Sequence, residues 1–144
     1  VLDAETALAA IEAGARFVVS PVFREEVVRT CHRFDVAAMP GAFTPTEVLA
    51  AWEAGADVVK VFPATTLGPG YFRDLRGPFP DLRLMPTGGV SLANARDWIR
   101  AGAVAVGVGT ALVDPEAVAF RRFGELAERA RRLVAAVAEA RGAR

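Results

Sequence analysis

Short apolar runs alternate with amphipathic stretches along the whole chain, and this alternation restricts the fold more than any other feature. Five runs are apolar on both faces: 16–20, 36–39, 57–62, 83–85 and 104–108. Strands that are buried on both faces belong to parallel sheets covered by helices, so we predict an α/β fold. The spacing of roughly twenty residues favours a TIM (β/α)8 barrel over an open doubly wound sheet. An open sheet for dinucleotides would carry G-x-G-x-x-G after a strand, and no run is followed by it.

Local signals place helices between these runs. The helical patterns before the last one cover 3–13, 24–33, 45–54 and 92–100, and a glycine- and proline-rich loop with a short helix leads from strand 57–62 to Pro78. Thr44-Pro45-Thr46-Glu47 combines an N-cap, a proline at the first helical position and the glutamate of a capping box. Ser91 is the predicted cap of helix 92–100. Asp114-Pro115 opens one long final helix, whose apolar stripe is expected to be core or subunit contact. That stripe consists of Phe120, Phe123, Leu126, Leu133, Val134 and Val137.

The number of predicted strands is small for a closed barrel. About five βα units are predicted, whereas a barrel has eight and usually at least 200 residues. We therefore expect residues 1–144 to form a single domain, the C-terminal two thirds of a barrel made of the last five βα units. The N-terminal portion, about three units, is expected to be missing. An open flank is then expected beside strand 16–20.

Charge and composition exclude several classes of protein. Seventeen acidic residues balance seventeen basic ones, which argues against a nucleic-acid or membrane-surface partner. No apolar run approaches the eighteen or so residues of a membrane span and no secretory leader is present, so a cytoplasmic protein is predicted. Cys31 is the single cysteine and His32 the single histidine, so neither an internal disulfide nor a metal site is expected.

Lys60 is the only lysine of the chain and lies in the most apolar run. Alternation places Val59 and Val61 on one face of the strand and Val58, Lys60 and Phe62 on the other. At pH 7 only about one free lysine in two thousand is a neutral nucleophile, and desolvation increases that fraction. A catalytic amine is one interpretation. A lysine that reaches out of the strand end, or pairs with a buried carboxylate, is the other, and spacing alone leaves both open.

Glycine-containing turns follow two successive predicted strands. These turns are Gly88-Gly89 and Gly109-Thr110. Glycines allow backbone N–H groups to approach an anion, and loops after the last strands of a barrel frequently bind phosphate. Either turn alone is a weak signal because turns use glycine anyway, but the two together predict a phosphate site.

The segment from Gly55 to Ala64, closing at Gly68, resembles the Schiff-base signature of the KDPG and KHG aldolases (2-keto-3-deoxy-6-phosphogluconate and 4-hydroxy-2-oxoglutarate aldolases). Val61 departs from it, since that family more often has Leu or Phe there. Further matches to the family motifs are Ser20-Pro21, Pro40-Gly41, Pro86-Thr87-Gly88-Gly89 and Gly109-Thr110. The resembling segments extend over nearly the whole chain.

This resemblance implies a class I aldolase, a lyase on a TIM barrel, homotrimeric and without a metal or organic cofactor. Lys60 would attack the C2 carbonyl of a phosphorylated 2-keto acid and release pyruvate with glyceraldehyde 3-phosphate, or with glyoxylate from the shorter substrate. Phe62 and Thr87 would line the substrate pocket, Thr87 would help to select the substrate, and Pro21 would flank the site. The phosphate would be held by Gly88, Gly89, Gly109 and Thr110.

One part of the family pattern is absent from the sequence. The family's general base is a glutamate in an E-[LIV]-T-[LF]-R segment whose arginine grips the substrate carboxylate, and no such segment occurs here. It is expected in the missing N-terminal portion, together with a Gly-Ala-Gly-Thr strand end. No glutamate of the chain is expected to replace it, because these residues lie on predicted helices and face water: Glu12, Glu25, Glu26, Glu47 and Glu53. A pairing of Glu53 or Asp57 with a nearby arginine would be ordinary surface chemistry.

Two alternatives remain open at this point. One is another phosphate-binding TIM-barrel enzyme, such as a sugar-phosphate isomerase or synthase, in which Lys60 only contacts the substrate. The other is an inactive fragment of the aldolase or a binding scaffold.

Overall fold

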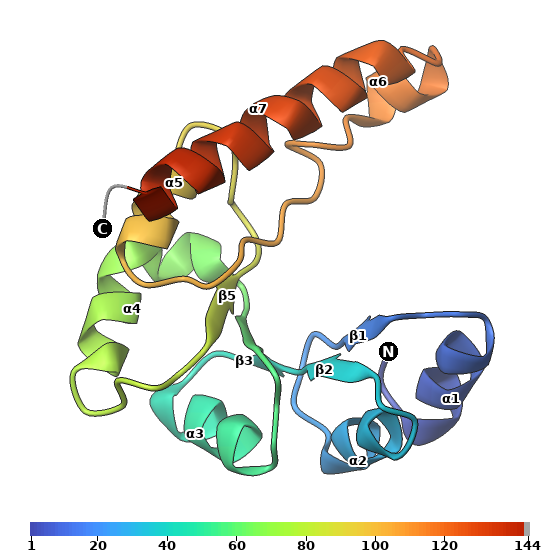
Figure 1. Cartoon of the computed structure of the whole chain (residues 1–144), viewed down its shortest axis with the longest axis vertical. Coiled ribbons are helices and arrows are strands. Elements are labelled where there is room, and N and C mark those ends of the chain that lie inside the picture. Colours follow the sequence, from blue (N-terminus) through green and yellow to red (C-terminus); the bar gives the residue numbers. More distant parts are fainter. Residues whose placement is uncertain (143–144) are drawn as a thin grey trace.

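The computed structural model describes residues 1–142, which form five short strands, one 3-10 helix and seven α-helices (Figure 1). The predicted domain 1–144 thus includes two residues that lie outside the described part. The elements are α1 (Ala4–Glu12), β1 (Phe17–Val19), α2 (Glu25–Arg33), β2 (Ala37–Met39), β3 (Gly41–Ala42), α3 (Pro45–Glu53), β4 (Val59–Val61), η1 (Ala64–Thr66), α4 (Gly68–Arg76), β5 (Leu84–Pro86), α5 (Ala95–Arg100), α6 (Pro115–Ala119) and α7 (Phe123–Gly142).

All strand pairs are parallel, as the sequence predicts. β1 pairs with β2, and β3, β4 and β5 form a second sheet in that order. The two sheets meet where the chain passes from β2 through Pro40 into β3. In Figure 1 the strands lie in a curved row, with α2, α3 and α4 on one side of it. Within residues 1–142 the row does not close into a barrel, and β1 is an edge strand.

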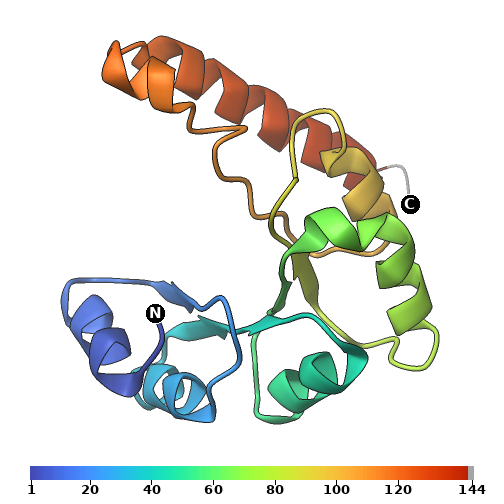
Figure 2. The ribbon, with the colours of Figure 1, turned by 180° about the vertical axis from the view of Figure 1, so that it is seen from behind.

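The apolar side chains form two clusters, one for each sheet. The first is built on Val18, Val27, Val28 and Cys31, where α1 and α2 cover β1 and β2. The second surrounds β3 to β5 and is covered by α3, α4, α5 and the end of α7. Seen from behind, α1 and α2 lie at one end of the molecule, and α6 and α7 extend away at the other (Figure 2). Every helix within residues 1–142 is too short or too polar to cross a membrane.

The capping box predicted for α3 is confirmed. The Thr44 side chain accepts a hydrogen bond from the Glu47 N–H, and the Glu47 carboxylate accepts one from the Thr44 N–H. Pro45 occupies the first turn, where its missing N–H costs nothing. These interactions fix the point at which the chain leaves β3 and enters α3.

The prediction of a strand over 104–108 is wrong. This segment makes only an isolated parallel bridge between Gly107 and Thr87, although the Val104 N–H donates to the Leu84 carbonyl of β5. The physical reason lies in Pro86, the last residue of β5, which has no N–H to donate back across the pair. The Val104 and Gly107 N–H groups donate to the Leu84 and Pro86 carbonyls, but no continuous ladder forms between them.

The final helix is also not continuous. α6 ends at Ala119 because Arg121 has a φ of 53°, and the Arg122 N–H closes a Schellman turn on the Ala117 carbonyl. Glycine usually occupies this left-handed position, so the sequence carries no signal for the break. The apolar stripe divides accordingly: Leu133 and Val137 pack on the core, whereas Phe120, Phe123 and Val134 are 59–69% exposed.

The start of α5 differs from the prediction as well. The helix begins at Ala95, and Ser91 is not its cap. Instead, the Asn94 side chain accepts a hydrogen bond from the Ser91 N–H and donates one to the Gly89 carbonyl. These bonds form a tight turn between the Gly88-Gly89 turn and α5.

Candidate active site

β4 holds Lys60 in the middle of the three-stranded sheet, opposite Gly41 of β3 and Met85 of β5. Its neighbours Val59 and Val61 are fully buried, whereas the Lys60 side chain is half-buried on the other face. The predicted division of this strand into two faces is therefore confirmed. Because both neighbouring strands are paired to β4, the backbone of Lys60 is held rigidly.

The surroundings of the Lys60 amine act on its charge in two ways. Burial lowers the pKa of Lys60 from its ordinary value, because the cationic form loses solvation. Phe62, two residues on, places its ring centroid 4.7 Å from Lys60 Nζ, an arrangement that attracts a cation. Lys60 forms no ion pair with a carboxylate of residues 1–142, so the interpretation of a buried Lys–carboxylate pair is excluded there.

Two pockets open at the end of the sheet where the strands finish, one on each side of β4. The larger has a volume of about 300 Å³ and brings together the residues predicted to bind substrate and phosphate. Its lining consists of Phe62, Thr87, Gly88, Gly89, Val90, Ser91, Gly109, Thr110 and Ala111. We call it the glycine pocket. Its lining includes no arginine or lysine, so an anion there would meet backbone N–H groups and hydroxyls.

The backbone of the glycine pocket requires glycine. Gly88 and Gly89 have φ values of 91° and 70°, in the left-handed region that side chains disfavour. A Cβ at Gly89 would collide with the side chain of Thr65. Thr87, which precedes the turn, has a buried Oγ1 without a hydrogen-bond partner within residues 1–142. This oxygen is enclosed by the protein and faces Gly107, where an added Cβ would collide with it.

The second pocket, of about 240 Å³, lies between the ends of β1, β3 and β4. It is lined by Pro21, Val22, Phe23, Gly41, Ala42, Phe43, Glu47 and Phe62. Phe62 thus forms a wall of both pockets, and Pro21 flanks the site on the side of β1. Lys60 itself lines neither pocket, but its amine lies against the Phe62 ring that separates them.

Glu47 is a pocket residue that the sequence did not reveal. Its side chain is exposed, as expected for a helix position, but it also lines the second pocket. Glu47 Oε2 accepts hydrogen bonds from the N–H groups of Thr44 and Phe43 and from the Thr44 hydroxyl. These bonds hold the pKa of Glu47 below its ordinary value. Only the three-dimensional turn after β3 brings this carboxylate to the pocket.

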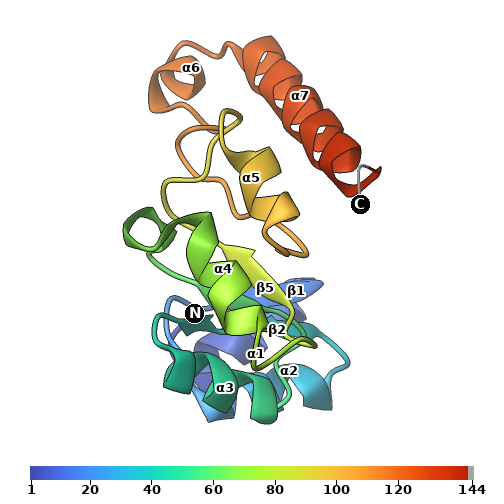
Figure 3. The same ribbon diagram turned by 90° about the vertical axis from the view of Figure 1, so that its left-hand side faces the viewer.

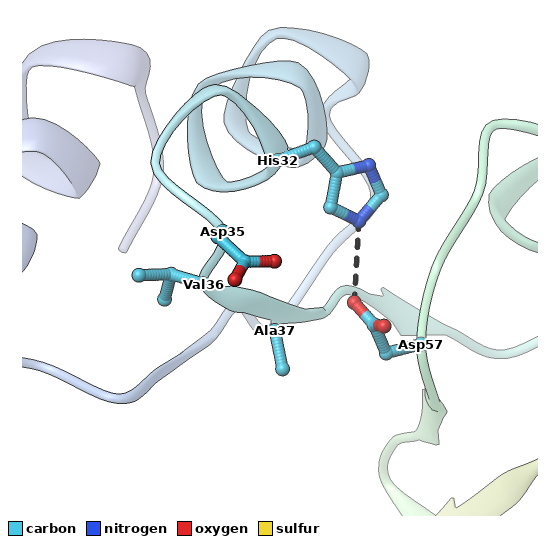
Figure 4. Close-up of a pocket in the computed structure, with 5 residues that line it drawn as sticks. All are labelled: His32, Asp35, Val36, Ala37 and Asp57. Atoms are coloured by element: carbon cyan, nitrogen blue, oxygen red, sulfur yellow. Dashed lines mark hydrogen bonds and ion pairs between the residues drawn. The ribbon is translucent and has the colours of Figure 1, made fainter.

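A third pocket lies beside α2, where β2 begins, and contains the single histidine (Figure 4). His32 Nε2 lies 3.2 Å from Asp57 Oδ2, which also accepts a hydrogen bond from the Ala38 N–H. Asp57 thus pairs with His32 and not with an arginine. None of the residues predicted to bind substrate lines this pocket. No group of three or more His, Cys, Asp or Glu within residues 1–142 is arranged to hold a metal ion.

Comparison with known proteins identifies relatives over most of the chain. A family model described as KDPG and KHG aldolase matches residues 1–127. A 2-dehydro-3-deoxy-phosphogluconate aldolase from Pseudomonas aeruginosa is 40% identical over 122 residues, which is 84% of this chain and 55% of that protein. The chain spans between half and two thirds of the length of this and the next two curated relatives.

Solved structures of aldolases also superpose on most of the chain. A structure described as native KDPGal superposes with a TM-score of 0.87 at 32% identity, over 97% of this chain and 66% of that one. A KDPG aldolase from Legionella pneumophila, solved with pyruvate captured as a covalent carbinolamine, superposes with a TM-score of 0.82 at 25% identity, over 96% and 65% of the two chains.

Proposed function

The chain belongs to the KDPG and KHG aldolase family, and from this premise we propose that it carries the Schiff-base lysine and the phosphate pocket of a class I aldolase. The observation that carries the proposal is the placement of Lys60. It is the only lysine, it is half-buried on a strand between two others, and burial shifts its amine towards the neutral form. Membership of the family favours this activity over that of a sugar-phosphate isomerase or synthase.

The chemistry begins when the neutral Lys60 amine attacks the C2 carbonyl of a 2-keto acid. The carbinolamine loses water to give an iminium, and the C3–C4 bond breaks as its electron pair flows towards the iminium nitrogen. The C4 hydroxyl loses its proton as the aldehyde leaves, and the enamine takes up a proton at C3. Water then hydrolyses the iminium to pyruvate and restores the amine. The carbinolamine of the Legionella pneumophila enzyme is the first intermediate of such a route.

Phe62 has a defined part in this scheme. An iminium on Lys60 Nζ carries a positive charge, and the nearby Phe62 ring attracts a cation by about 0.5–1 kcal/mol at a partly exposed site. The ring therefore favours the iminium over the neutral carbinolamine. Its position between the two pockets also makes it a wall against which the substrate chain lies.

The glycine pocket is proposed to bind the phosphate of the substrate. Gly88, Gly89 and Gly109 present backbone without side chains, and Thr110 adds a hydroxyl. Thr87 lines this pocket, which supports a part in substrate selection. We propose 2-keto-3-deoxy-6-phosphogluconate as the substrate and 4-hydroxy-2-oxoglutarate as a shorter one. Pro21 bounds the site from the side of β1.

Glu47 is not proposed as the general base. It lies in the second pocket, but three hydrogen bonds hold one of its oxygens and lower its pKa, which makes it a weak proton acceptor. Its function in this structure is to cap α3.

The arrangement of strands is proposed to be part of a (β/α)8 barrel within one domain, and the protein is proposed to act as a cytoplasmic homotrimer. The curved row of parallel strands with helices on one side supports the barrel (Figure 1). The exposed apolar side chains of Phe120, Phe123 and Val134 support subunit contact.

Reductive trapping tests the proposal. The native gene product is incubated with pyruvate and borohydride and then digested for mass spectrometry. We expect one label per chain, at Lys60, and loss of activity in Lys60→Ala. Lys60→Arg is expected to be equally inactive, because a guanidinium keeps its proton near neutral pH. Labelling of the N-terminal amine alone, or undiminished turnover by Lys60→Ala, would falsify the assignment.

A further inference from the structure

The segment 108–112 has a second side, which faces α7 rather than the glycine pocket. Figure 3 shows α7 lying beside α5, with the segment that leads to α6 close by. A pocket of about 200 Å³ opens between them. It is lined by Leu92, Val108, Ala111, Leu112, Arg129, Arg132 and Leu133. Only Ala111 also lines the glycine pocket, so the two are separate.

The two arginines of this α7 pocket differ in what they already bind. Arg129 Nη1 lies 3.2 Å from Asp114 Oδ2, so its charge is balanced within the chain. Asp114 uses its other oxygen to cap α6. Arg132, three residues after Arg129 and on the same side of the helix, forms no ion pair or hydrogen bond with any residue of 1–142. Its neighbour Glu128 is paired with Arg131, and Glu139 with Arg96.

The remaining walls of the α7 pocket are apolar. Leu92, Val108, Leu112 and Leu133 are each partly buried, and Arg132, which lines the pocket with them, is exposed. One unpaired guanidinium matches the charge of one monoanion, and its planar fork matches the two oxygens of a carboxylate. The volume lies below the roughly 300–1,000 Å³ of sites for drug-sized ligands, so only a small molecule would fit.

We propose that the α7 pocket binds a small carboxylate with a short apolar body. Arg132 grips the carboxylate, and Leu92, Leu112 and Leu133 enclose the apolar part. This site is independent of the Schiff-base chemistry at Lys60 and of phosphate binding in the glycine pocket. A test of carboxylate binding in the α7 pocket is therefore independent of a test of the proposed aldolase activity.

Calorimetric titration of the native gene product with butyrate tests the proposal. Butyramide, its neutral counterpart, and inorganic phosphate serve as the other probes. We expect saturable binding of butyrate, none of butyramide, and a loss of butyrate affinity of about tenfold or more in Arg132→Gln, as for a charged hydrogen bond. Leu112→Ser removes part of the apolar wall and is expected to lower the affinity for butyrate as well.

Arg100→Gln is the matched control, because Arg100 is exposed, unpaired within residues 1–142 and remote from the α7 pocket lining. It should bind butyrate as the wild type does, and Arg132→Gln should keep its affinity for inorganic phosphate. The proposal is overturned if the wild type shows no saturable butyrate binding or if Arg132→Gln binds butyrate unchanged. Equal weakening by Arg100→Gln, or a selective loss of phosphate in Arg132→Gln, would also overturn it.

Discussion

At the scale of single residues, two opposing effects act on the protonation of the Lys60 amine. Burial removes water from the ammonium and lowers its pKa, whereas the Phe62 ring attracts the charged form. The two effects serve different steps of the proposed reaction. Desolvation supplies the neutral nucleophile, and the ring then stabilises the cationic iminium after the amine has reacted.

The lowered pKa of Lys60 predicts how pyruvate labelling depends on pH. An amine whose pKa lies below 10.5 becomes half neutral at a lower pH than free lysine. The rate of pyruvate labelling at Lys60 should therefore reach half of its plateau below pH 10.5. The measurement is the labelling rate against pH, compared with a peptide that carries residues 57–62. Coinciding midpoints for protein and peptide would contradict the shift.

The second prediction at this scale concerns a substitution at Gly89 in the glycine pocket. Gly89→Val would force a side chain into the left-handed region and against Thr65. We expect KM for the phosphorylated substrate to rise by about 10- to 100-fold, as for loss of a charged hydrogen bond. KM for glyoxylate with pyruvate should change little. Gly109→Ala, whose Cβ meets no atom within 4 Å, is the milder comparison. Equal losses with both substrates would indicate a general structural role for Gly89.

At the scale of elements, Asp57 connects the two sheets. It precedes β4, its N–H donates to the Ala38 carbonyl of β2, and its carboxylate accepts from the Ala38 N–H and from His32 of α2. Burial alone would raise the pKa of Asp57, but these hydrogen bonds hold it below the ordinary value. The close-up in Figure 4 shows the His32 ring reaching across to this carboxylate.

Replacement of Asp57 should therefore destabilise the protein. Asp57→Ala is expected to lower the free energy of unfolding by about 1 kcal/mol at neutral pH, since its hydrogen bonds are partly exposed. A carboxyl with a lowered pKa in the folded state stabilises it above the unfolded value near 3.8, and this contribution is lost as the pH falls below that value. Urea unfolding should show a smaller difference in the free energy of unfolding between wild type and Asp57→Ala at pH 3 than at pH 7.

Asp81→Ala provides the control for this measurement, because Asp81 is exposed and forms no hydrogen bond or ion pair within residues 1–142. It should change stability by a few tenths of a kcal/mol at most. A pH-independent deficit in Asp57→Ala would show that the carboxylate charge is not what joins the sheets.

At the scale of the whole molecule, the open row of strands leaves an unpaired edge. β1 pairs only with β2, and Phe17 on this strand is 57% exposed. Unpaired strand edges and exposed apolar groups favour association between molecules. Phe120, which caps the end of α6, and Phe123, which begins α7, are also exposed and add a second apolar surface. In Figure 2, α6 lies at the end of the molecule away from α1 and α2.

The 144-residue chain expressed by itself is therefore expected to self-associate. Light scattering should show a weight-average mass that rises with concentration. Phe17→Lys, which places a charge on the edge strand, should reduce this rise. Phe34→Lys is the control, because Phe34 is 46% exposed but lies at the end of α2 and not on a strand. A monomer that persists at every concentration would show that the β1 edge is harmless.

The sequence alone predicted those features that depend on neighbouring residues. Alternation indicated parallel strands between helices, and it placed Lys60 on the face opposite Val59 and Val61. The capping box at Thr44 and Glu47 was predicted correctly because its bonds span only three residues. Periodicity and caps are local properties, so they can be read without knowledge of the rest of the fold.

The tertiary structure decided several features that join distant segments. Pro86 interrupts the pairing of 104–108, Asp57 pairs with His32, and Arg121 ends α6 in a left-handed conformation. Glu47 reaches a pocket, and Arg132 is left without a partner. These outcomes depend on which side chains and N–H groups meet across the fold. In each of these cases the meeting of residues far apart in the chain is fixed by packing, which the local pattern does not encode.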